Sequence, residues 1–314
     1  MNWEQILTFT FLIQVVAASM RLGGPIIIAA VGEIYAERAG VFNLSVDGVM
    51  LLGGFMGFIV AYESENLWMG VIAATTIGAI MGLIFAFWTI SMRANQIVTG
   101  FTLLILSTGS AIYFNRLAFP TTGTALMPSV PRFRPLEIPL LSKIPVLGPI
   151  LFSHNALTYL FAGLLVLSTI ILFKTRYGLR ITAVGEYPAA ADTVGVNVKF
   201  IRYSAVVIGA ALAGLGGGYF SLAELGLFNE SMVGGRGFIA LALVIFGRWN
   251  PLLAAAGGLI FGAIDALQFR LQFLGAPVPS QLLIALPYVL TIIVLLFGRG
   301  RLAPAAITKA YTRE

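Results

Sequence analysis

Side chains that could perform acid–base, nucleophilic or metal chemistry are scarce in this chain. Its 314 residues contain one histidine, His154, and no cysteine. Zinc centres need cysteine or several histidine ligands, and serine- or cysteine-based catalysis needs a histidine beside the nucleophile. A lone histidine cannot furnish such a site. We therefore expect no catalytic residue and no metal ligand, and an enzyme is the least favoured class of function.

A second group of polar residues lies at the edges of long apolar runs. Asp47 begins the run 45–62, just after Asn43 and Ser45. Asp47 either stabilises the start of its own helix through the dipole, by about 0.3–1 kcal/mol, or belongs to a polar entry to a path through the protein. A helix cap and a path are also the two interpretations of three residues that open another run: Asn95, Gln96 and Thr99.

Two acidic residues accompany later apolar runs. Asp265 lies well inside 251–273, and Glu224 lies near the end of another run. Ionisable groups at membrane depth are rare and usually face other protein groups or a water path. We expect Asp265 to form an ion pair with Arg270 or Arg236, and we favour a structural role for that pair.

The composition shows which kind of element must position these residues. Hydrophobic residues make up 59% of the chain, charged residues 10%, and the mean hydropathy is +0.95. Soluble domains carry about 25% charged residues, because they need a solvated surface. The net charge of +6 and the pI near 9.7 come from Lys and Arg between apolar runs, a pattern typical of membrane topology rather than of nucleic-acid binding. Lipid is therefore the expected solvent.

A helix needs about 20 residues to cross a bilayer core. Runs of suitable length lie at 45–62, 67–91, 96–118, 156–173, 200–223, 251–273 and 279–297. Three segments are shorter or interrupted: 5–20, 24–37 and 236–248, the second starting at its proline. The sequence thus predicts an all-α polytopic membrane protein with about ten transmembrane segments. The first of them is expected to be retained, because the start of the chain has no basic region and no cleavage site.

Lys and Arg in short connections mark the cytoplasmic side of a membrane protein. They gather in 174–202 and in the C-terminal tail, so both termini are predicted to be cytoplasmic. Residues 120–155 hold seven prolines and are expected to form an extracytoplasmic loop, which leaves 1–314 as a single transmembrane domain. Ten segments can divide into a 5+5 inverted repeat, an arrangement common among transporters.

The polar loop 174–199 separates two apolar runs. Its Glu186–Thr193 stretch is predicted as a short helix that starts near Pro188 and is ended by Gly195. A short Ala-rich helix between glycines can dock onto a soluble partner. A simple connecting loop is the alternative interpretation.

Three stretches of the chain carry specific motifs. Residues 185–197 read Gly-Glu-Tyr-Pro-Ala-Ala-Ala-Asp-Thr-Val-Gly-Val-Asn, and residues 37–48 read Glu-Arg-Ala-Gly-Val-Phe-Asn-Leu-Ser-Val-Asp-Gly. Residues 234–247 begin with a Gly-x-Gly-Phe segment and precede Trp249-Asn250-Pro251. Together these stretches resemble the ABC-importer permeases for ribose-type sugars, nucleosides and branched-chain amino acids. The 37–48 stretch resembles the form typical of the nucleoside branch.

The resemblance implies a permease subunit that moves a small polar solute, most simply a nucleoside, into the cell across the plasma membrane. It also implies three partners: a second permease subunit in a heterodimer or homodimer, a cytoplasmic ATP-binding subunit and an extracytoplasmic substrate-binding protein. This chain lacks a Gly-x-x-x-x-Gly-Lys-(Ser/Thr) loop, so ATP and Mg are expected on the partner ATPase, with no cofactor and no nucleic acid on this chain. Residues implied in ATPase coupling are Gly185, Glu186, Ala190, Ala191, Asp192 and Gly195.

The expected substrate path follows from the polar and aromatic residues above. Its candidate residues are Asn43, Ser45, Asp47, Phe55, Asn95, Gln96, Thr99 and Phe238. A phenylalanine can stack a nucleobase for about 1–3 kcal/mol, and Phe58 and Phe101 are further candidates. With 23 phenylalanines, packing and lipid contact are the alternatives for any one of them. Other functions left open are transport of simple sugars or branched-chain amino acids, and ion-coupled secondary transport, which would need paired acids at mid-membrane.

Overall fold

The fold was analysed in a computed structural model, which describes residues 9–120, 128–137, 144–273 and 303–312, with a few single positions between these ranges. The predicted segment 279–297 lies outside the continuous ranges. Within the described part of the chain, seven helices are long and apolar enough to cross a membrane. They are α2 (Phe9–Arg38), α3 (Val46–Ser64), α4 (Leu67–Ala86) with its π-helical extension η1 (Phe87–Ser91), α5 (Gln96–Ala118), α7 (Ala156–Lys174), α10 (Val198–Tyr219) with its π-helical extension η2 (Phe220–Leu225), and α12 (Pro251–Phe273).

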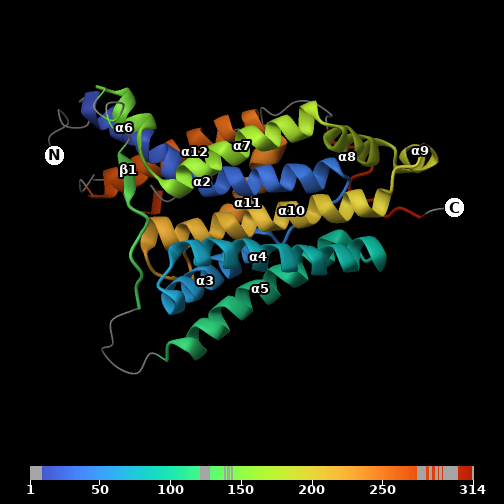
Figure 1. Cartoon of the computed structure of the whole chain (residues 1–314), viewed down its shortest axis with the longest axis horizontal. Coiled ribbons are helices and arrows are strands. Elements are labelled where there is room, and N and C mark those ends of the chain that lie inside the picture. Colours follow the sequence, from blue (N-terminus) through green and yellow to red (C-terminus); the bar gives the residue numbers. More distant parts are fainter. Residues whose placement is uncertain are drawn as a thin grey trace.

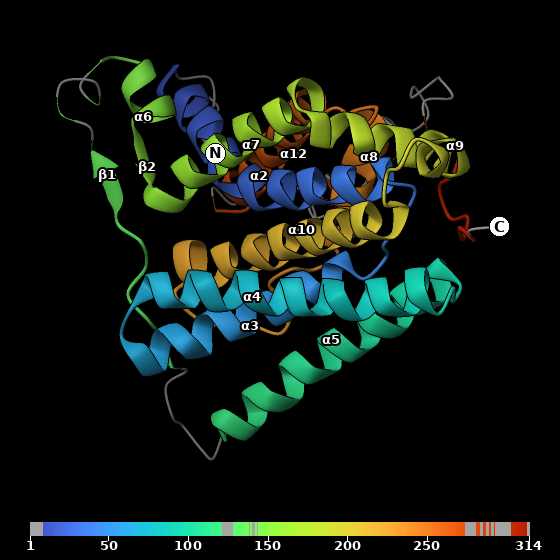
Figure 2. The same ribbon diagram turned by 45° about the vertical axis from the view of Figure 1, so that its right-hand side comes forward.

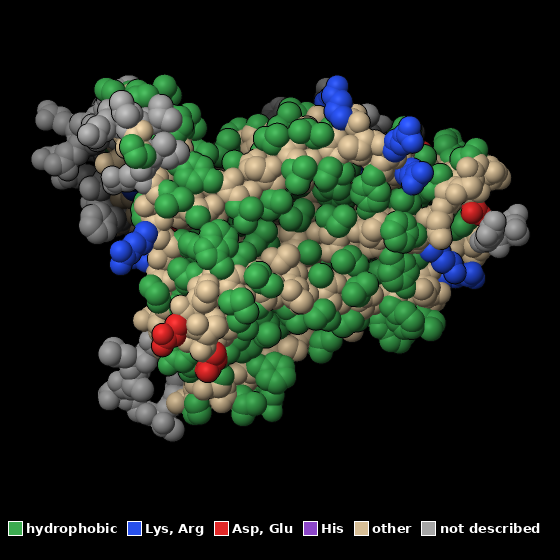
Figure 3. Space-filling model, in the orientation of Figure 1, with side chains coloured by type: hydrophobic (Ala, Val, Ile, Leu, Met, Phe, Trp, Pro, Cys, Tyr) green, Lys and Arg blue, Asp and Glu red, His purple; other side chains and the backbone are tan. Residues whose placement is uncertain are grey.

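The long helices run along the long axis of the molecule, so the chain has two ends (Figure 1). One end carries the short helices α8 (Arg176–Glu186) and α9 (Pro188–Thr193), and we name it the α9 end. The other, the β1 end, carries α6 (Leu147–Leu151) and the antiparallel strands β1 (Pro135–Glu137) and β2 (Ser153–Asn155). Hydrophobic side chains cover the middle of the face in Figure 3, and Lys, Arg, Asp and Glu side chains lie towards its ends. The protein is thus a multi-pass membrane protein.

Helix α10 lies between α2 and α4 in both ribbon views (Figures 1 and 2). Its small residues bring the backbones close together: Gly209 packs against Gly32 of α2, and Gly214 packs against Gly78 of α4. Membrane helices use small residues in this way, because lipid tails leave little hydrophobic drive between them. Most of α10 is accordingly buried, and its Ala- and Gly-rich part, residues 205–218, is a packing surface.

The prediction of two segments, 5–20 and 24–37, is corrected by α2, which is one helix with Pro25 inside it. A proline in a membrane helix is tolerated where neighbouring helices pack against the disrupted turn. Gly23 provides such packing, since a Cβ added there would lie 2.5 Å from the carbonyl oxygen of Gly258 in α12. The chain therefore crosses once here, from Phe9 at the β1 end to Arg38 at the α9 end (Figure 1).

The predicted short segment 236–248 is a half-length helix, α11 (Arg236–Phe246). The chain reaches it from the β1 end, where the Val130 N–H donates to the Gly226 carbonyl at 2.8 Å. Gly235, with φ of +83°, turns the chain into α11. Its 11 residues extend about 16 Å, roughly half of a bilayer core. The N-terminus of α11 consequently lies between the two ends of the molecule. The 5+5 repeat stays a prediction.

The 120–155 excursion packs at the β1 end, and its described part includes the two strands and α6. His154 is buried there, with its Nε2 2.7 Å from the Ile150 carbonyl oxygen. The imidazole therefore bonds within the excursion, in keeping with a structural role.

Acidification should weaken this part of the fold. Burial lowers the pKa of His154 below its usual value of 6.5, so the folded protein binds fewer protons than the unfolded chain as the pH falls through 6.5. The free energy of unfolding should then decrease, by at most about 1.4 kcal/mol per pH unit. The decrease can be measured by thermal unfolding of the detergent-solubilised protein at pH 7.5 and at pH 5.5. The His154→Gln variant should lose the part of this dependence that His154 contributes; an unchanged difference between the two pH values would contradict the assignment.

Candidate functional site at the α9 end

The loop 174–199 folds into two helices, of which α9 projects farthest at its end of the molecule (Figures 1 and 2). Pro188 is the first residue of α9, and Gly195, with φ of +84°, follows its last turn. The predicted short helix is confirmed, and α8 precedes it. Ala190 is exposed on α9, whereas Ala191 is buried against the body of the protein. The two alanines of the motif therefore have different surroundings.

A feature that the sequence did not indicate is the C-terminal segment 303–312, which packs on this loop. The Ala306 N–H donates to the Gly185 carbonyl at 2.8 Å. The Tyr311 hydroxyl donates to Asp192 Oδ2 at 2.8 Å, and the Ala305 N–H reaches Glu186 Oε2 at 3.4 Å. The C-terminal segment thus ties α8 and α9 together. No periodic pattern marks so short a segment, so sequence reasoning could not find it.

Arg202 of α10 joins the C-terminal segment to the connection between α2 and α3. Its Nε donates to the Ala39 carbonyl at 3.1 Å, and its Nη1 donates to the Lys309 carbonyl at 3.0 Å. Arg202 is almost fully buried, so both bonds are shielded from water. Gly185 packs directly on the Arg38 carbonyl, which leaves no room for a side chain there. The 185–197 and 37–48 motifs are therefore neighbours in space.

The third motif, residues 234–247 with the Trp249-Asn250-Pro251 turn, contacts the other two through Trp249. Its indole Nε1 donates to Glu37 Oε2 at 2.6 Å, and the Trp249 carbonyl accepts from Arg38 Nε at 2.9 Å. The Arg38 guanidinium also lies over the Phe173 ring, 4.6 Å from its centroid. The paired residues Glu37 and Arg38 thus hold the end of α11 against the end of α2, and the three motifs form one assembly at the α9 end.

Several candidate path residues stabilise the backbone around the start of α3 and α5. Asn43 Oδ1 accepts bonds from the N–H and the hydroxyl of Ser45, at 3.0 and 2.7 Å. Gln96 Oε1 accepts the Phe42 N–H at 2.8 Å, which ties α5 to the same connection. Asn95 caps α5 by accepting the Ile97 and Val98 N–H groups, and Thr99 follows one turn later, its N–H donating to the Asn95 carbonyl. The cap interpretation is confirmed for Asn95, and a path role for these residues stays a prediction.

Asp47 caps a helix other than its own. Its Oδ1 accepts the Gly237 N–H at 2.9 Å, near the N-terminus of α11, where the helix dipole favours a negative charge. The backbone of Gly237 packs directly on Asp47, and only a glycine fits there. The interpretation of Asp47 as an acid serving the start of α3 is thus incomplete: it joins α3 to the half-length helix.

The ion pair expected for Asp265 is made with Arg236, at 2.9 Å between Nη2 and Oδ2. Arg270 instead lies over the Phe11 ring. Breaking a buried pair leaves one charge without its partner, at a cost of about 3–5 kcal/mol. Asp265→Asn should therefore lower the midpoint of thermal unfolding markedly in detergent.

The matched control is a substitution in an exposed pair. Glu230→Gln breaks the Arg116–Glu230 contact, whose side chains are 70% and 40% exposed, and should cost less than about 1 kcal/mol. Equal losses in Asp265→Asn and Glu230→Gln would show that burial of Asp265 has no energetic consequence.

The candidate aromatic residues differ in how deeply they are buried. Phe55 is buried edge-on against Phe228, with 5.5 Å between ring centroids, and Phe58 is buried one turn later on α3. Phe101 and Phe238 are exposed on the surface of the chain, 47% and 42%. Phe55 and Phe238 therefore have different surroundings, although the sequence placed both in the path.

The chain can be compared with known proteins on this basis. The family model described as the permease component of the branched-chain amino acid transport system matches residues 15–297. The guanosine ABC transporter permease protein NupQ of Bacillus subtilis is 37% identical over 91% of this chain and 92% of its own length. The nucleoside ABC transporter permease protein NupC of Lactococcus lactis is 34% identical over 94% of this chain and 95% of its own length. The putative glucose ABC transporter permease protein TsgC13 of Haloferax volcanii is 34% identical over 95% of this chain and 97% of its own length.

No solved structure matches the chain. The family match covers all three motifs that meet at the α9 end and all but the first few residues of the described transmembrane helices. The chain therefore belongs to the family of permease components typified by branched-chain amino acid transport systems.

Proposed function

We propose that this chain is the transmembrane permease subunit of an ABC importer that carries nucleosides into the cell, with ATP hydrolysed on a separate subunit. The observation that carries the proposal is the assembly at the α9 end. There a short helix with an exposed tip is held to the transmembrane body by the C-terminal segment and by Arg202. A rigidly held, exposed helix can receive force from a soluble ATPase, whereas a loose connection could not transmit it.

The α9 end is the cytoplasmic side in this proposal. Basic side chains are exposed on the connections there, as the positive-inside rule requires: Arg93, Lys174, Arg176, Arg180, Lys199, Arg248 and Lys309. The β1 end then faces the cell exterior, with the 120–155 excursion on that side. The membrane is the plasma membrane, and 1–314 forms one permease domain.

Three partners complete the importer. A second permease subunit is supported by the relatives, because both NupC and NupB of Lactococcus lactis resemble this chain, NupB at 27% identity. An ATP-binding subunit would bind α9, and a substrate-binding protein would deliver its ligand at the β1 end. ATP and Mg belong to the ATPase, and this chain carries no cofactor.

Nucleosides are the proposed substrate, because two relatives covering nearly the whole chain carry guanosine or nucleoside in their names. A simple sugar is the second candidate, favoured by the resemblance to the putative glucose permease. Asp265 is the candidate acid for the alternative of ion-coupled transport. Its carboxylate is bonded to Arg236, so it would not be available as a lone mid-membrane acid for a proton relay.

The test is reconstitution of the chain with its ATPase, second permease and binding protein in liposomes. We expect ATP hydrolysis to be stimulated by the binding protein loaded with a nucleoside, together with nucleoside uptake. Stimulation by glucose, ribose or leucine alone would reject the nucleoside assignment. Failure of the chain to co-purify with any ATPase would reject the importer itself.

A further inference from the structure

A pocket of about 1090 Å³ opens at the β1 end, between α3, α5 and the 226–235 segment that leads to α11. Its volume is slightly above the range of roughly 300–1000 Å³ that is typical of small-molecule sites, so the pocket has room for such a ligand. None of the residues singled out for the path lines it, apart from Phe58. One wall of the pocket is aromatic, and the other is polar.

The aromatic wall consists of Phe58, Tyr62 and Phe119, with Phe228 beside it. The Tyr62 and Phe119 rings meet edge to face at 5.3 Å, and the Phe58 and Phe119 ring centroids lie 5.9 Å apart. Phe58 is buried, whereas Tyr62 is 41% exposed, so the wall extends from the interior to the mouth of the pocket. Aromatic rings arranged in this way provide faces and edges on which a flat ring can stack.

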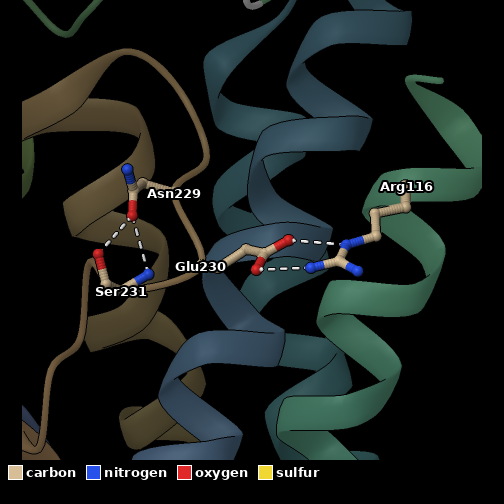
Figure 4. Close-up of polar contacts among 4 residues, drawn as sticks. All are labelled: Arg116, Asn229, Glu230 and Ser231. Carbon is tan, nitrogen blue, oxygen red and sulfur yellow. Dashed lines mark hydrogen bonds and ion pairs between the residues drawn. The ribbon is translucent and has the colours of Figure 1, made fainter. Parts of the chain in front are cut away.

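The polar wall consists of Arg116 on α5 and of Asn229, Glu230 and Ser231 in the 226–235 segment (Figure 4). Arg116 donates two bonds to Glu230, at 3.1 and 3.2 Å, and this pair bridges the two elements. Asn229 Oδ1 accepts the N–H and the hydroxyl of Ser231, so the amide nitrogen of Asn229 points away from Ser231 (Figure 4). The exposed Arg116–Glu230 pair is weak, so ligand hydroxyls can replace its bonds.

The two walls fit a ligand with a flat aromatic ring at one end and hydroxyl groups at the other. We propose that this pocket binds a nucleoside on its way across the membrane, with the base stacked on Tyr62 and Phe119 and the ribose hydroxyls bonded by Arg116 and Glu230. A hexose offers hydroxyls without an aromatic ring, and leucine offers neither. The inference rests on the proposed function and adds to it the place where the permease first holds its substrate.

Variants at the mouth of the pocket test the inference in the complete reconstituted importer. Uptake of tritiated guanosine, adenosine, uridine and cytidine is first compared with that of glucose, and the best wild-type nucleoside is then used. Tyr62→Ala should reduce its uptake about fivefold or more, because a stacking face is lost, and Tyr62→Phe should restore it. Tyr113→Ala is the matched control, since Tyr113 is 62% exposed on α5 and does not line the pocket.

A second measurement locates the ligand directly. Photolysis with 8-azidoadenosine should label peptides containing Tyr62 or Phe119, and excess adenosine should prevent the labelling. Labelling of peptides around Tyr113 alone would show that the probe binds outside the pocket, at the membrane interface, and would overturn the inference. Equal nucleoside uptake by the Tyr62→Ala and Tyr113→Ala variants would overturn it as well. If wild-type protein transports glucose and no nucleoside, the proposed function fails as well, so the two failures are distinguishable.

Discussion

Replacing Ala190 with glutamate should reduce nucleoside uptake by the reconstituted importer about tenfold or more, while the permease itself folds normally. Ala190 is exposed on α9, so a larger side chain there meets no neighbour within this chain. A charge introduced into the centre of an interface with a soluble subunit costs at least about 1.4 kcal/mol, which is tenfold in affinity. Co-purification of the ATP-binding subunit with Ala190→Glu should fall together with uptake.

Ala191 cannot serve as the same probe. It is buried, so Ala191→Glu would force a carboxylate between α9 and the body and disturb the loop itself. The matched control is Ala183→Glu, which makes the same change at an exposed position on the preceding helix α8. We expect Ala183→Glu to retain most of its uptake. Normal uptake and normal ATPase binding in Ala190→Glu would contradict a docking role for α9.

Removing the C-terminal segment from residue 303 onwards should uncouple ATP hydrolysis from uptake. The segment donates hydrogen bonds to Gly185 and Glu186 of α8 and to Asp192 of α9, the first of them from the Ala306 N–H at 2.8 Å. Its loss also leaves buried Arg202 without the Lys309 carbonyl. Without these hydrogen bonds, a movement of α9 is no longer transmitted to the transmembrane helices. More ATP should therefore be hydrolysed for each nucleoside taken up. The measurement is the ratio of the two rates in proteoliposomes.

A substitution that removes one hydroxyl group tests the coupling of ATP hydrolysis to uptake while the C-terminal segment stays in place. Tyr311→Phe removes only the hydroxyl that donates to Asp192, a bond to a charged group worth about 1.5–3 kcal/mol. We expect the ratio of ATP to nucleoside to rise severalfold. Tyr203→Phe is the matched control, because the hydroxyl of Tyr203 on α10 bonds Ser91 of η1, at 2.6 Å, rather than a residue of α9. A ratio unchanged in both variants would show that the C-terminal segment does not position α9.

The half-length helix α11 explains the polar contact that Asp47 makes near the start of α3. The N-terminus of α11 lies between the two ends of the molecule, and Asp47 is beside it. Backbone N–H groups at such a terminus would be costly without acceptors, because no water is available at membrane depth. Asp47 accepts one of them, and the Gly237 contact fixes the approach. The contact with α11 therefore accounts for the carboxylate of Asp47, whereas Asn43 bonds Ser45 within its own turn.

Hydropathy in the sequence alone determined the membrane-spanning class and six of the seven long helices, within a few residues at each end. It did so because each such helix satisfies its own backbone hydrogen bonds, so length and apolar composition suffice. The same local logic located the short helix at Pro188–Thr193, through its proline and the following Gly195. It failed at Pro25, where a local rule ended a helix that packing against α12 continues.

Only the tertiary structure decided which polar residues meet. Glu37 and Trp249 are 212 positions apart in the chain, and Arg202 is 107 positions from Lys309, so no periodic pattern relates them. Their contacts depend on how the long helices pack through glycines such as Gly209 and Gly32. The sequence therefore indicated the three motifs one by one. Their assembly at one end of the molecule, and the C-terminal segment that binds it, follow from backbone packing that spans the whole chain.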